Sequence, residues 1–209
     1  MVLDQLQSSA LHRDWRAGLP TLGGRRVVLR EVRRSDAPAL FAALATEEVA
    51  RFISTPPDSA AGFEAFILWS DRQRAAGAAI CYAVTLDGSD TPVGIFQVRQ
   101  ITNGFETAEW GFALASACWG TGVFQESAEL VLEFAFEVLG AQRIEARATT
   151  VNGRGQGALL KLGATHEGIL RSALRRGDRT FDQALYAILE AEWRANRGRI
   201  PASSSTHVH

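Results

Sequence analysis

The chain has little cysteine, and its cysteines are not spaced as metal ligands. Of its 209 residues only two are cysteine, Cys81 and Cys118, and they form no CxxC motif. Zinc sites commonly draw on such paired cysteines, and disulfide frameworks need more of them. We therefore expect no metal and no disulfide, and a reducing, cytoplasmic location.

Charge of one sign and long apolar runs are also missing. The 22 basic and 23 acidic residues leave a formal net charge of -1, which favours neither nucleic acid nor an anionic membrane. The first thirty residues lack the apolar block of a signal peptide, and no apolar run approaches the length of a membrane span. We expect no nucleic acid and no membrane as partner.

What remains is an ordinary globular composition, 46% hydrophobic, with alternating helical and strand periodicities. We expect an N-terminal arm at 1–23, one domain at 24–195 and a disordered tail at 196–209. Strands are expected at 25–32, 78–86, 91–100, 107–115, 141–150, 164–171 and 179–189, and helices at 37–53, 63–77, 123–140 and within 151–163. Because helices fall between strands, the order predicts a mixed α/β fold with helices on both faces of the sheet.

Local patterns predict how two helices begin and which side of a third faces water. Ser35 or Asp36 supplies an N-cap oxygen for the first helix, and Asp58 or Ser59 for the second. The longest helix carries one acidic stripe, which predicts a solvent-exposed face and consists of Glu126, Glu129, Glu133 and Glu137.

A glycine turn, "CWGTGVFQES", stands between the 107–115 strand and the longest helix. Gly120 and Gly122 permit positive φ, and consecutive N–H groups at a helix N-terminus can bind a diphosphate. The Walker motif GxxxxGK[S/T] is absent, and GxGxxG fails here because Gln125 replaces the third glycine. A GxGxxA variant at 153–158 opens a helix, but the strands after it are typical of a hairpin rather than a βαβ unit.

The residues around the glycine turn carry a family resemblance. "AEWGFALASACWGTGVFQESAELVLEFAFEVLG", followed by "RIEARATTVNGRGQGALLKLGATHEGILR", resembles the GCN5-related N-acetyltransferases (GNAT), in particular the ribosomal-protein-alanine acetyltransferase (RimJ/RimL-like) branch. "LPTLGGRRVVLREVRRSDAPAL" is similar to the opening of that branch, so the resemblance spans about residues 19–190.

The resemblance implies an α+β fold whose mostly antiparallel, twisted sheet has about seven strands and splayed central strands. The pantetheine arm of acetyl-CoA would lie in the gap where the strand before the glycine turn splays from the strand after the helix. The implied cofactor-binding residues are Phe112, Ala113 and Leu114, which pair with pantetheine; Gly120, Thr121, Gly122, Val123 and Phe124, which surround the diphosphate; and Trp119, Asn152 and Gly155. Trp119 either stacks on the cofactor or packs in the core, and Asn152 either bonds pantetheine or orients the helix that begins there.

Glu109 matches the acidic position of the family near the start of the central strand. The resemblance implies that it is the general base, acting directly or through water, because an ammonium must lose a proton before it attacks. It could also only bind the ammonium, or be a solvated carboxylate. Leu159 stands where many relatives have a tyrosine that protonates the leaving thiolate. In this chain the thiolate therefore departs unassisted, or water or Cys118 protonates it.

We expect an acetyl-CoA-dependent N-acetyltransferase that acts by direct transfer in a ternary complex, as a monomer or homodimer. The acceptor is a protein N-terminal amine or a small amine, and Phe52, Phe63, Phe66 and Trp69 either wall its pocket or pack in the core. Two other functions stay open, a non-catalytic acyl-CoA-binding module and a dinucleotide-binding oxidoreductase that uses residues 153–158.

Overall fold

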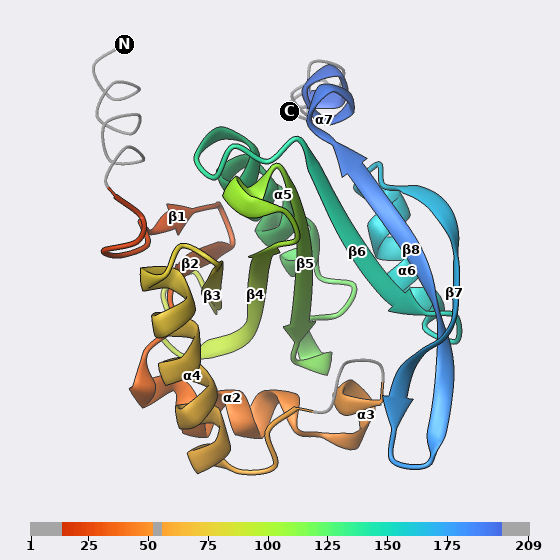
Figure 1. Cartoon of the computed structure of the whole chain (residues 1–209). Coiled ribbons are helices and arrows are strands. Elements are labelled where there is room, and N and C mark those ends of the chain that lie inside the picture. Colours follow the sequence, from red (N-terminus) through yellow and green to blue (C-terminus); the bar gives the residue numbers. More distant parts are fainter. Residues whose placement is uncertain (1–13, 52–55, 198–209) are drawn as a thin grey trace, which may run out of the picture.

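The computed structural model describes residues 14–51 and 56–197 (Figure 1). Most of the expected arm, nearly all of the expected tail and Phe52 lie outside these residues. The strands are β1 (Leu22–Gly23), β2 (Val27–Glu31), β3 (Ala79–Leu86), β4 (Pro92–Gln100), β5 (Thr107–Leu114), β6 (Arg143–Thr149), β7 (Thr165–Arg176) and β8 (Arg179–Leu189). The helices are α2 (Ala37–Leu44), α3 (Glu47–Ala50), α4 (Ala60–Ala75), α5 (Val123–Glu137), α6 (Gly153–Lys161) and α7 (Glu190–Arg197).

All eight strands join one sheet in the order β1-β2-β3-β4-β5-β6-β8-β7. Every neighbouring pair is antiparallel except β5 and β6, which are parallel. The expected mixed and mostly antiparallel fold is confirmed, and so is the meander from β3 to β5. The strand missed by the sequence analysis is β1, whose two residues are too short to show a pattern.

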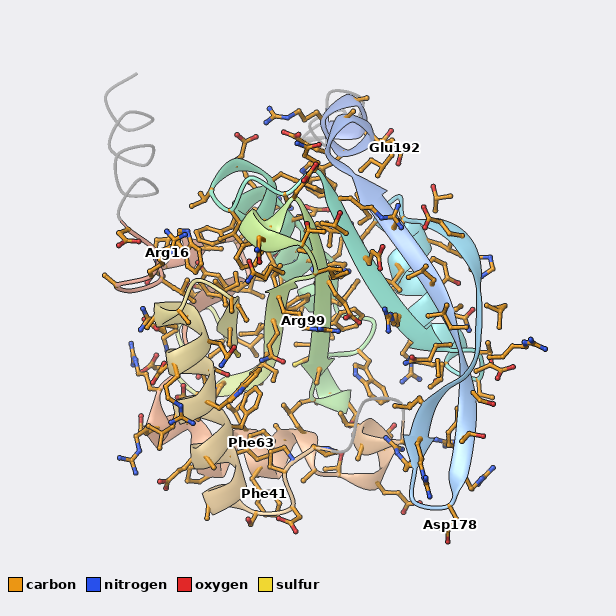
Figure 2. All side chains as sticks on the ribbon, viewed as in Figure 1. Arg16, Phe41, Phe63, Arg99, Asp178 and Glu192 are labelled. Atoms are coloured by element: carbon orange, nitrogen blue, oxygen red, sulfur yellow. The ribbon has the colours of Figure 1, made fainter. Side chains whose placement is uncertain are left out.

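Helices cover both faces of the sheet, as expected (Figure 1). On one face α2 and α4 pack together, and Figure 2 shows Phe41 and Phe63 in this layer, with their ring centroids 6.4 Å apart. On the other face α5 and α6 cover a larger core. Because side chains alternate along a strand, β5 serves both layers, with Trp110 in one core and Ala113 in the other.

The first helical segment differs from the expectation in two ways. Its predicted single helix is divided into α2 and α3, with the break at Ala45 and Thr46. Asp36 occupies the N-cap position of α2, but its carboxylate accepts no hydrogen bond from that helix; Oδ2 accepts from Arg33 N, just before the helix, at 2.8 Å. Both of its oxygens instead accept from the buried Arg30 guanidinium at 2.8 Å. An unpaired buried charge destabilises the fold more than a missing helix cap does. The cap predicted for α4 is confirmed, since Ser59 Oγ accepts from Gly62 N at 3.1 Å.

The acidic stripe of α5 is not uniformly solvated. Glu126 Oε1 accepts from the backbone N–H groups of Arg25 and Arg26, and thereby ties the β1–β2 turn to the start of α5. Trp15 and Leu22, from the segment expected to be an arm, are buried in the larger core. In the described part of the chain, no helix is long and apolar enough to cross a membrane.

Candidate active site

The parallel pair β5 and β6 is joined at one end only. Its register begins at Thr107 opposite Arg143 and ends at Glu109 opposite Glu145. Beyond Glu109, β5 continues beside β4 as far as Leu114, while β6 continues beside β8 as far as Thr149. The two strands therefore separate, as Figure 1 shows, and Glu109 stands where the separation begins.

Alternate residues of β5 hydrogen-bond to β4, and the remaining ones direct their amides into this gap. Ala115 N donates to Val93 O and Ile101 N to Thr107 O, each at 2.8 Å. In an antiparallel ladder alternate residues bond to the same neighbour, so Ala113 directs its amide toward β4. Phe112 and Leu114 direct their N–H groups to the opposite side, where β6 has diverged.

The glycine turn follows β5 and opens α5. Gly120 has φ +75° and Gly122 has φ +88°, values that suit glycine better than any other residue. Within the described residues, the backbone N–H groups from Gly120 to Gln125 donate to no protein acceptor. The residues predicted to surround a diphosphate thus form a turn with a series of free donors.

Two guanidinium groups adjoin this turn, and the sequence analysis missed both. Arg26, from the β1–β2 turn, donates through Nη1 to Thr121 O at 2.8 Å. Arg154, from the first turn of α6, lies over the Trp119 ring, 4.0 Å from its centroid. Trp119 is also held by a 3.1 Å hydrogen bond from its indole N–H to Leu114 O. The local arginine cluster at residues 24–26 was a visible signal, but its position beside α5 depends on the fold.

Asn152 and Gly155 lie at the start of α6, and both line a cavity that Phe112 and Ala113 of β5 also line. Asn152 Oδ1 accepts from Gly155 N at 2.9 Å, so this side chain caps the helix. A Cβ atom at Gly155 would lie only 2.5 Å from Asn152 Nδ2. The absence of a side chain at Gly155 therefore leaves room for the asparagine cap.

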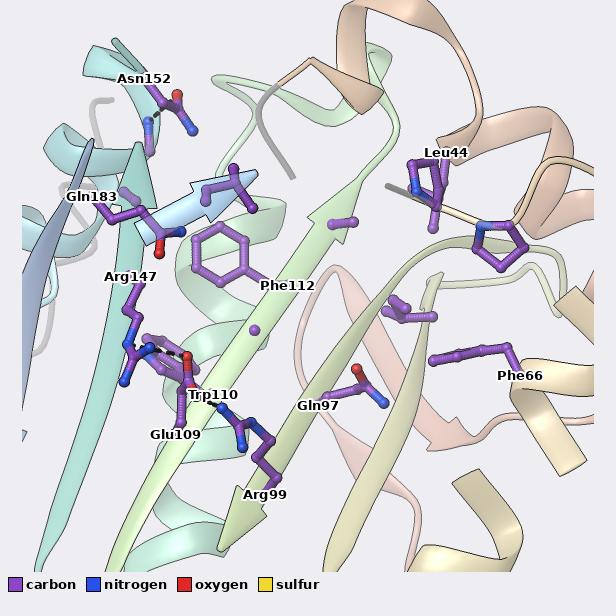
Figure 3. A pocket seen from close by; sticks show the side chains of 18 of the residues that line it. Leu44, Phe66, Gln97, Arg99, Glu109, Trp110, Phe112, Arg147, Asn152 and Gln183 are labelled. Atoms are coloured by element: carbon purple, nitrogen blue, oxygen red, sulfur yellow. Dashed lines mark hydrogen bonds and ion pairs between the residues drawn. The ribbon is translucent and has the colours of Figure 1, made fainter. Parts of the chain in front are cut away.

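A cavity of about 490 Å³ extends between the separated strands (Figure 3). Leu44, Phe63 and Phe66 line it from α2 and α4, and Phe112 lines it from β5. Ala173, Leu174 and Gln183 of the β7–β8 hairpin line another side. Trp69 does not line the cavity; its exposed ring packs beside Phe66 at a centroid distance of 6.2 Å.

Three charged side chains meet at the narrow end of the separation (Figure 3). Arg99, on β4, donates to Glu109 Oε2, and Arg147 Nε, on β6, lies 3.6 Å from Glu109 Oε1. The Glu109 side chain is only 15% exposed, whereas Arg99 and Arg147 are 59% and 37% exposed. Glu109 is therefore not a freely solvated carboxylate, and any acceptor ammonium would share it with two guanidinium groups.

None of the described cavity-lining residues is a tyrosine, cysteine or histidine. Leu159 is buried in the core, and Tyr186 donates its hydroxyl to Gln156 Oε1 at 3.0 Å on the side of α6. Cys118 is also a core residue, and burial raises the pKa of its thiol. The described lining therefore contains no side chain suited to protonate a thiolate.

The comparisons with known proteins agree with this architecture. The family model for the acetyltransferase (GNAT) domain matches residues 26–165, and the chain therefore belongs to the GNAT acetyltransferase family. The family expected from the sequence is confirmed.

Individual relatives are distant but cover most of the chain. YoaA of Bacillus subtilis, described as an uncharacterized N-acetyltransferase, is 24% identical over 82% of this chain and 97% of its own length. Mycobacterium smegmatis RimJ, solved with CoA-disulfide, superimposes with a TM-score of 0.77 at 22% identity, over 90% of this chain and 98% of RimJ. A GCN5-related N-acetyltransferase from Brucella melitensis gives a TM-score of 0.74 at 24% identity, covering 86% and 82% of the two chains. At these identities the solved structures support the fold.

Proposed function

We propose that this protein transfers the acetyl group of acetyl-CoA to a primary amine, directly and within a ternary complex. One observation carries the proposal beyond family membership: the β5–β6 separation leads to a turn whose N–H groups are free from Gly120 to Gln125. A long ligand with an amide-bearing arm and a diphosphate fits both features at once.

The acyl donor would bind along the separated edge of β5. The N–H groups of Phe112 and Leu114 would pair with the pantetheine amides, in the manner of an added strand. The diphosphate would accept from the free amides of the glycine turn, and the nearby guanidinium groups of Arg26 and Arg154 would add positive charge. The Mycobacterium smegmatis RimJ structure with CoA-disulfide supports this choice of ligand.

Glu109 would act on the acceptor amine at the narrow end of the gap. The ammonium gives a proton to Glu109, directly or through water, and the free nitrogen then attacks the thioester carbonyl. The new C–N bond forms as the C–S bond breaks, and the developing oxyanion accepts from a β5 backbone N–H. Because the described lining offers no acid, the leaving thiolate takes its proton from water, and the nitrogen returns a proton to that water as the amide forms.

A binding module without catalysis is the second candidate, because the described lining contains no general acid. The dinucleotide-binding alternative has less support. Residues 153–158 lie in α6, but β7 beyond them pairs antiparallel with β8 and not in parallel with β6. That connection lacks the βαβ crossover on which dinucleotide binding depends.

The variant Glu109→Gln tests the proposal, with Glu106→Gln as the matched control. Glu106 is exposed and its side chain does not line the cavity. We expect kcat/KM for thiol release to fall roughly 100- to 10,000-fold in Glu109→Gln, the usual range for a lost general base. The dissociation constant of acetyl-CoA, measured by calorimetry, should stay within about threefold of the parent value, because Glu109 acts on the amine and not on the acyl donor.

The other outcomes separate the candidates. Unchanged turnover in Glu109→Gln would show that Glu109 is not the general base. A parent protein that binds acetyl-CoA but acetylates no peptide, polyamine, amino acid or amino sugar is the binding module instead.

A further inference from the structure

We propose that the acceptor carries a carboxylate beside its amine, as in a free α-amino acid with an apolar side chain, and that Arg99 and Arg147 recognise this carboxylate. The inference rests on the proposed function and names the substrate class of the same cavity.

The charges of the cavity are unbalanced. Its described lining contains two arginines, Arg99 and Arg147, and a single carboxylate, Glu109. Among the described residues, Glu109 is the sole hydrogen-bond or ion-pair partner of both side chains. Neighbouring Glu145 does not neutralise the second arginine, because its Oε1 is paired with Arg143 Nε at 3.0 Å. The cavity therefore holds an excess positive charge.

The two guanidinium groups also have unused hydrogen-bond donors. A guanidinium has five N–H donors, and within the described part of the chain only Nη2 of the Arg99 nitrogens donates, to one carboxylate oxygen of Glu109. Arg147 lies 3.6 Å from the other oxygen and makes no hydrogen bond to it. Such planar, partly satisfied donors are suited to bind a carboxylate with two parallel hydrogen bonds.

The donor's phosphates are in the wrong place to use these arginines. Glu109 and the end of β5 at Leu114 are five residues apart, which corresponds to about 17 Å along a strand. The glycine turn lies beyond Leu114, so Arg99 and Arg147 face the acceptor rather than the diphosphate.

An α-amino acid matches the arrangement of charges. Its ammonium and carboxylate are attached to one carbon, so the ammonium can reach Glu109 while the carboxylate meets a guanidinium beside it. Its side chain would extend toward the apolar wall formed by Phe63, Phe66 and Ile95. A peptide N-terminus has a neutral carbonyl where the carboxylate would be, and a polyamine would add to the positive charge. Both leave Arg99 and Arg147 with Glu109 as their sole carboxylate among the described residues and with donors unused.

The experiment compares acids with their amides in the intact protein. Coenzyme A release is measured with L-phenylalanine and L-phenylalaninamide, with L-leucine and L-leucinamide, and with a peptide that begins with phenylalanine. We expect kcat/KM to be at least about tenfold higher for each acid than for its amide, the factor expected for one charge-assisted hydrogen-bonded contact. The less basic amine of the amide works against this ratio, so the test is a stringent one.

Variants show whether the two arginines cause the preference. In Arg99→Gln and Arg147→Gln the ratio of acid to amide should decrease, and in the double variant it should approach one, while the amide is still acetylated. Arg72→Gln, on the exposed surface of α4 and outside the cavity lining, should leave the ratio unchanged. Thermal melting checks that each variant is folded.

The outcomes distinguish this inference from the function on which it rests. Equal or better turnover of the amides or the peptide overturns the amino-acid acceptor and leaves the acetyltransferase intact. If acetyl-CoA binds but nothing is acetylated, calorimetry on the CoA-saturated protein decides, and equal binding of L-phenylalanine and its amide overturns the inference. A protein that does not bind acetyl-CoA overturns the proposed function and this inference together.

Discussion

Two neighbouring strand pairs in this sheet behave differently. β3 and β4 are paired along their length, from Ala79 opposite Arg99 to Thr85 opposite Pro92 with one register shift before Thr85, whereas β5 and β6 are paired only from Thr107 to Glu109. The first pair is held further by Arg30, which connects β2 to Asp36 and to Asp90 in the β3–β4 turn. The second pair has a cavity where its register ends.

The difference indicates where a ligand belongs. A backbone polar group left unpaired and shielded from water costs roughly 1–3 kcal/mol, so a sheet opens at its centre only where something else can pair with the strand edge. Around Arg30 the charges are balanced, since Arg30 and Arg33 pair with Asp36 and Asp90. Near β5 and β6 the amides of the glycine turn and the guanidinium donors of Arg99 and Arg147 are available to a ligand.

The largest effect of a substitution is expected in the closed region, by which we mean the β3–β4 pair and the Arg30 ion pairs beside it. Asp36→Ala leaves the buried Arg30 guanidinium with the exposed Asp90 as its remaining carboxylate. We expect a loss of about 3 kcal/mol in the free energy of unfolding, as for other broken buried pairs, with acetyl-CoA affinity retained. Urea unfolding measures the loss, and Ser35→Ala, at the exposed neighbouring residue, is the control. A loss no larger than that of the control would show that the Arg30–Asp36 ion pair does not stabilise the closed region.

A smaller effect is expected in the open region, and on binding rather than stability. Gly122→Ala forces a side chain into positive φ, where its Cβ would lie 2.7 Å from Arg26 Nη1. The distorted turn should weaken acetyl-CoA about tenfold, which is about 1.4 kcal/mol. Gly140→Ala imposes similar strain at φ +76° but has no atoms within 4 Å of its Cβ and lies beyond the other end of α5. Calorimetry that finds the same acetyl-CoA affinity in both variants would contradict the role given to the turn.

The smallest effect concerns the strands beyond the gap. Arg143 on β6 donates to Glu167 on β7, and this hydrogen bond lowers the pKa of the Glu167 carboxyl. A lowered pKa in the folded state means that the pair stabilises the protein above the ordinary glutamate pKa of about 4.3, and that this contribution disappears as the pH falls through the lowered value. Arg143→Gln should cost less than about 1 kcal/mol at pH 7, because Glu167 is partly exposed.

Urea unfolding of the parent and of Arg143→Gln at pH 7 and at about pH 3 tests this prediction. The difference between the two proteins should shrink at the lower pH. A difference that is the same at both values would mean that the ion pair is not its source.

Much of the architecture follows from local sequence signals. The β3–β5 meander, the α5 helix after Gly122 and the Ser59 cap all depend on residues close together in the chain, where periodicity and turn chemistry act. The break between α2 and α3 was missed because helical periodicity continues across it. The role of Asp36 was misassigned because its partner, Arg30, comes from another element.

The sequence by itself determined the family, the order of the elements and the positions of the glycine turn and Glu109, since each depends on a short motif. Only the tertiary structure decided that β5 and β6 separate after Glu109, that Ala113 directs its amide to β4, and that Arg99 and Arg147 converge on one carboxylate. These features arise from strand register and from contacts between residues far apart in the chain. Charge pairing and hydrogen bonding act through space, so no local pattern records them.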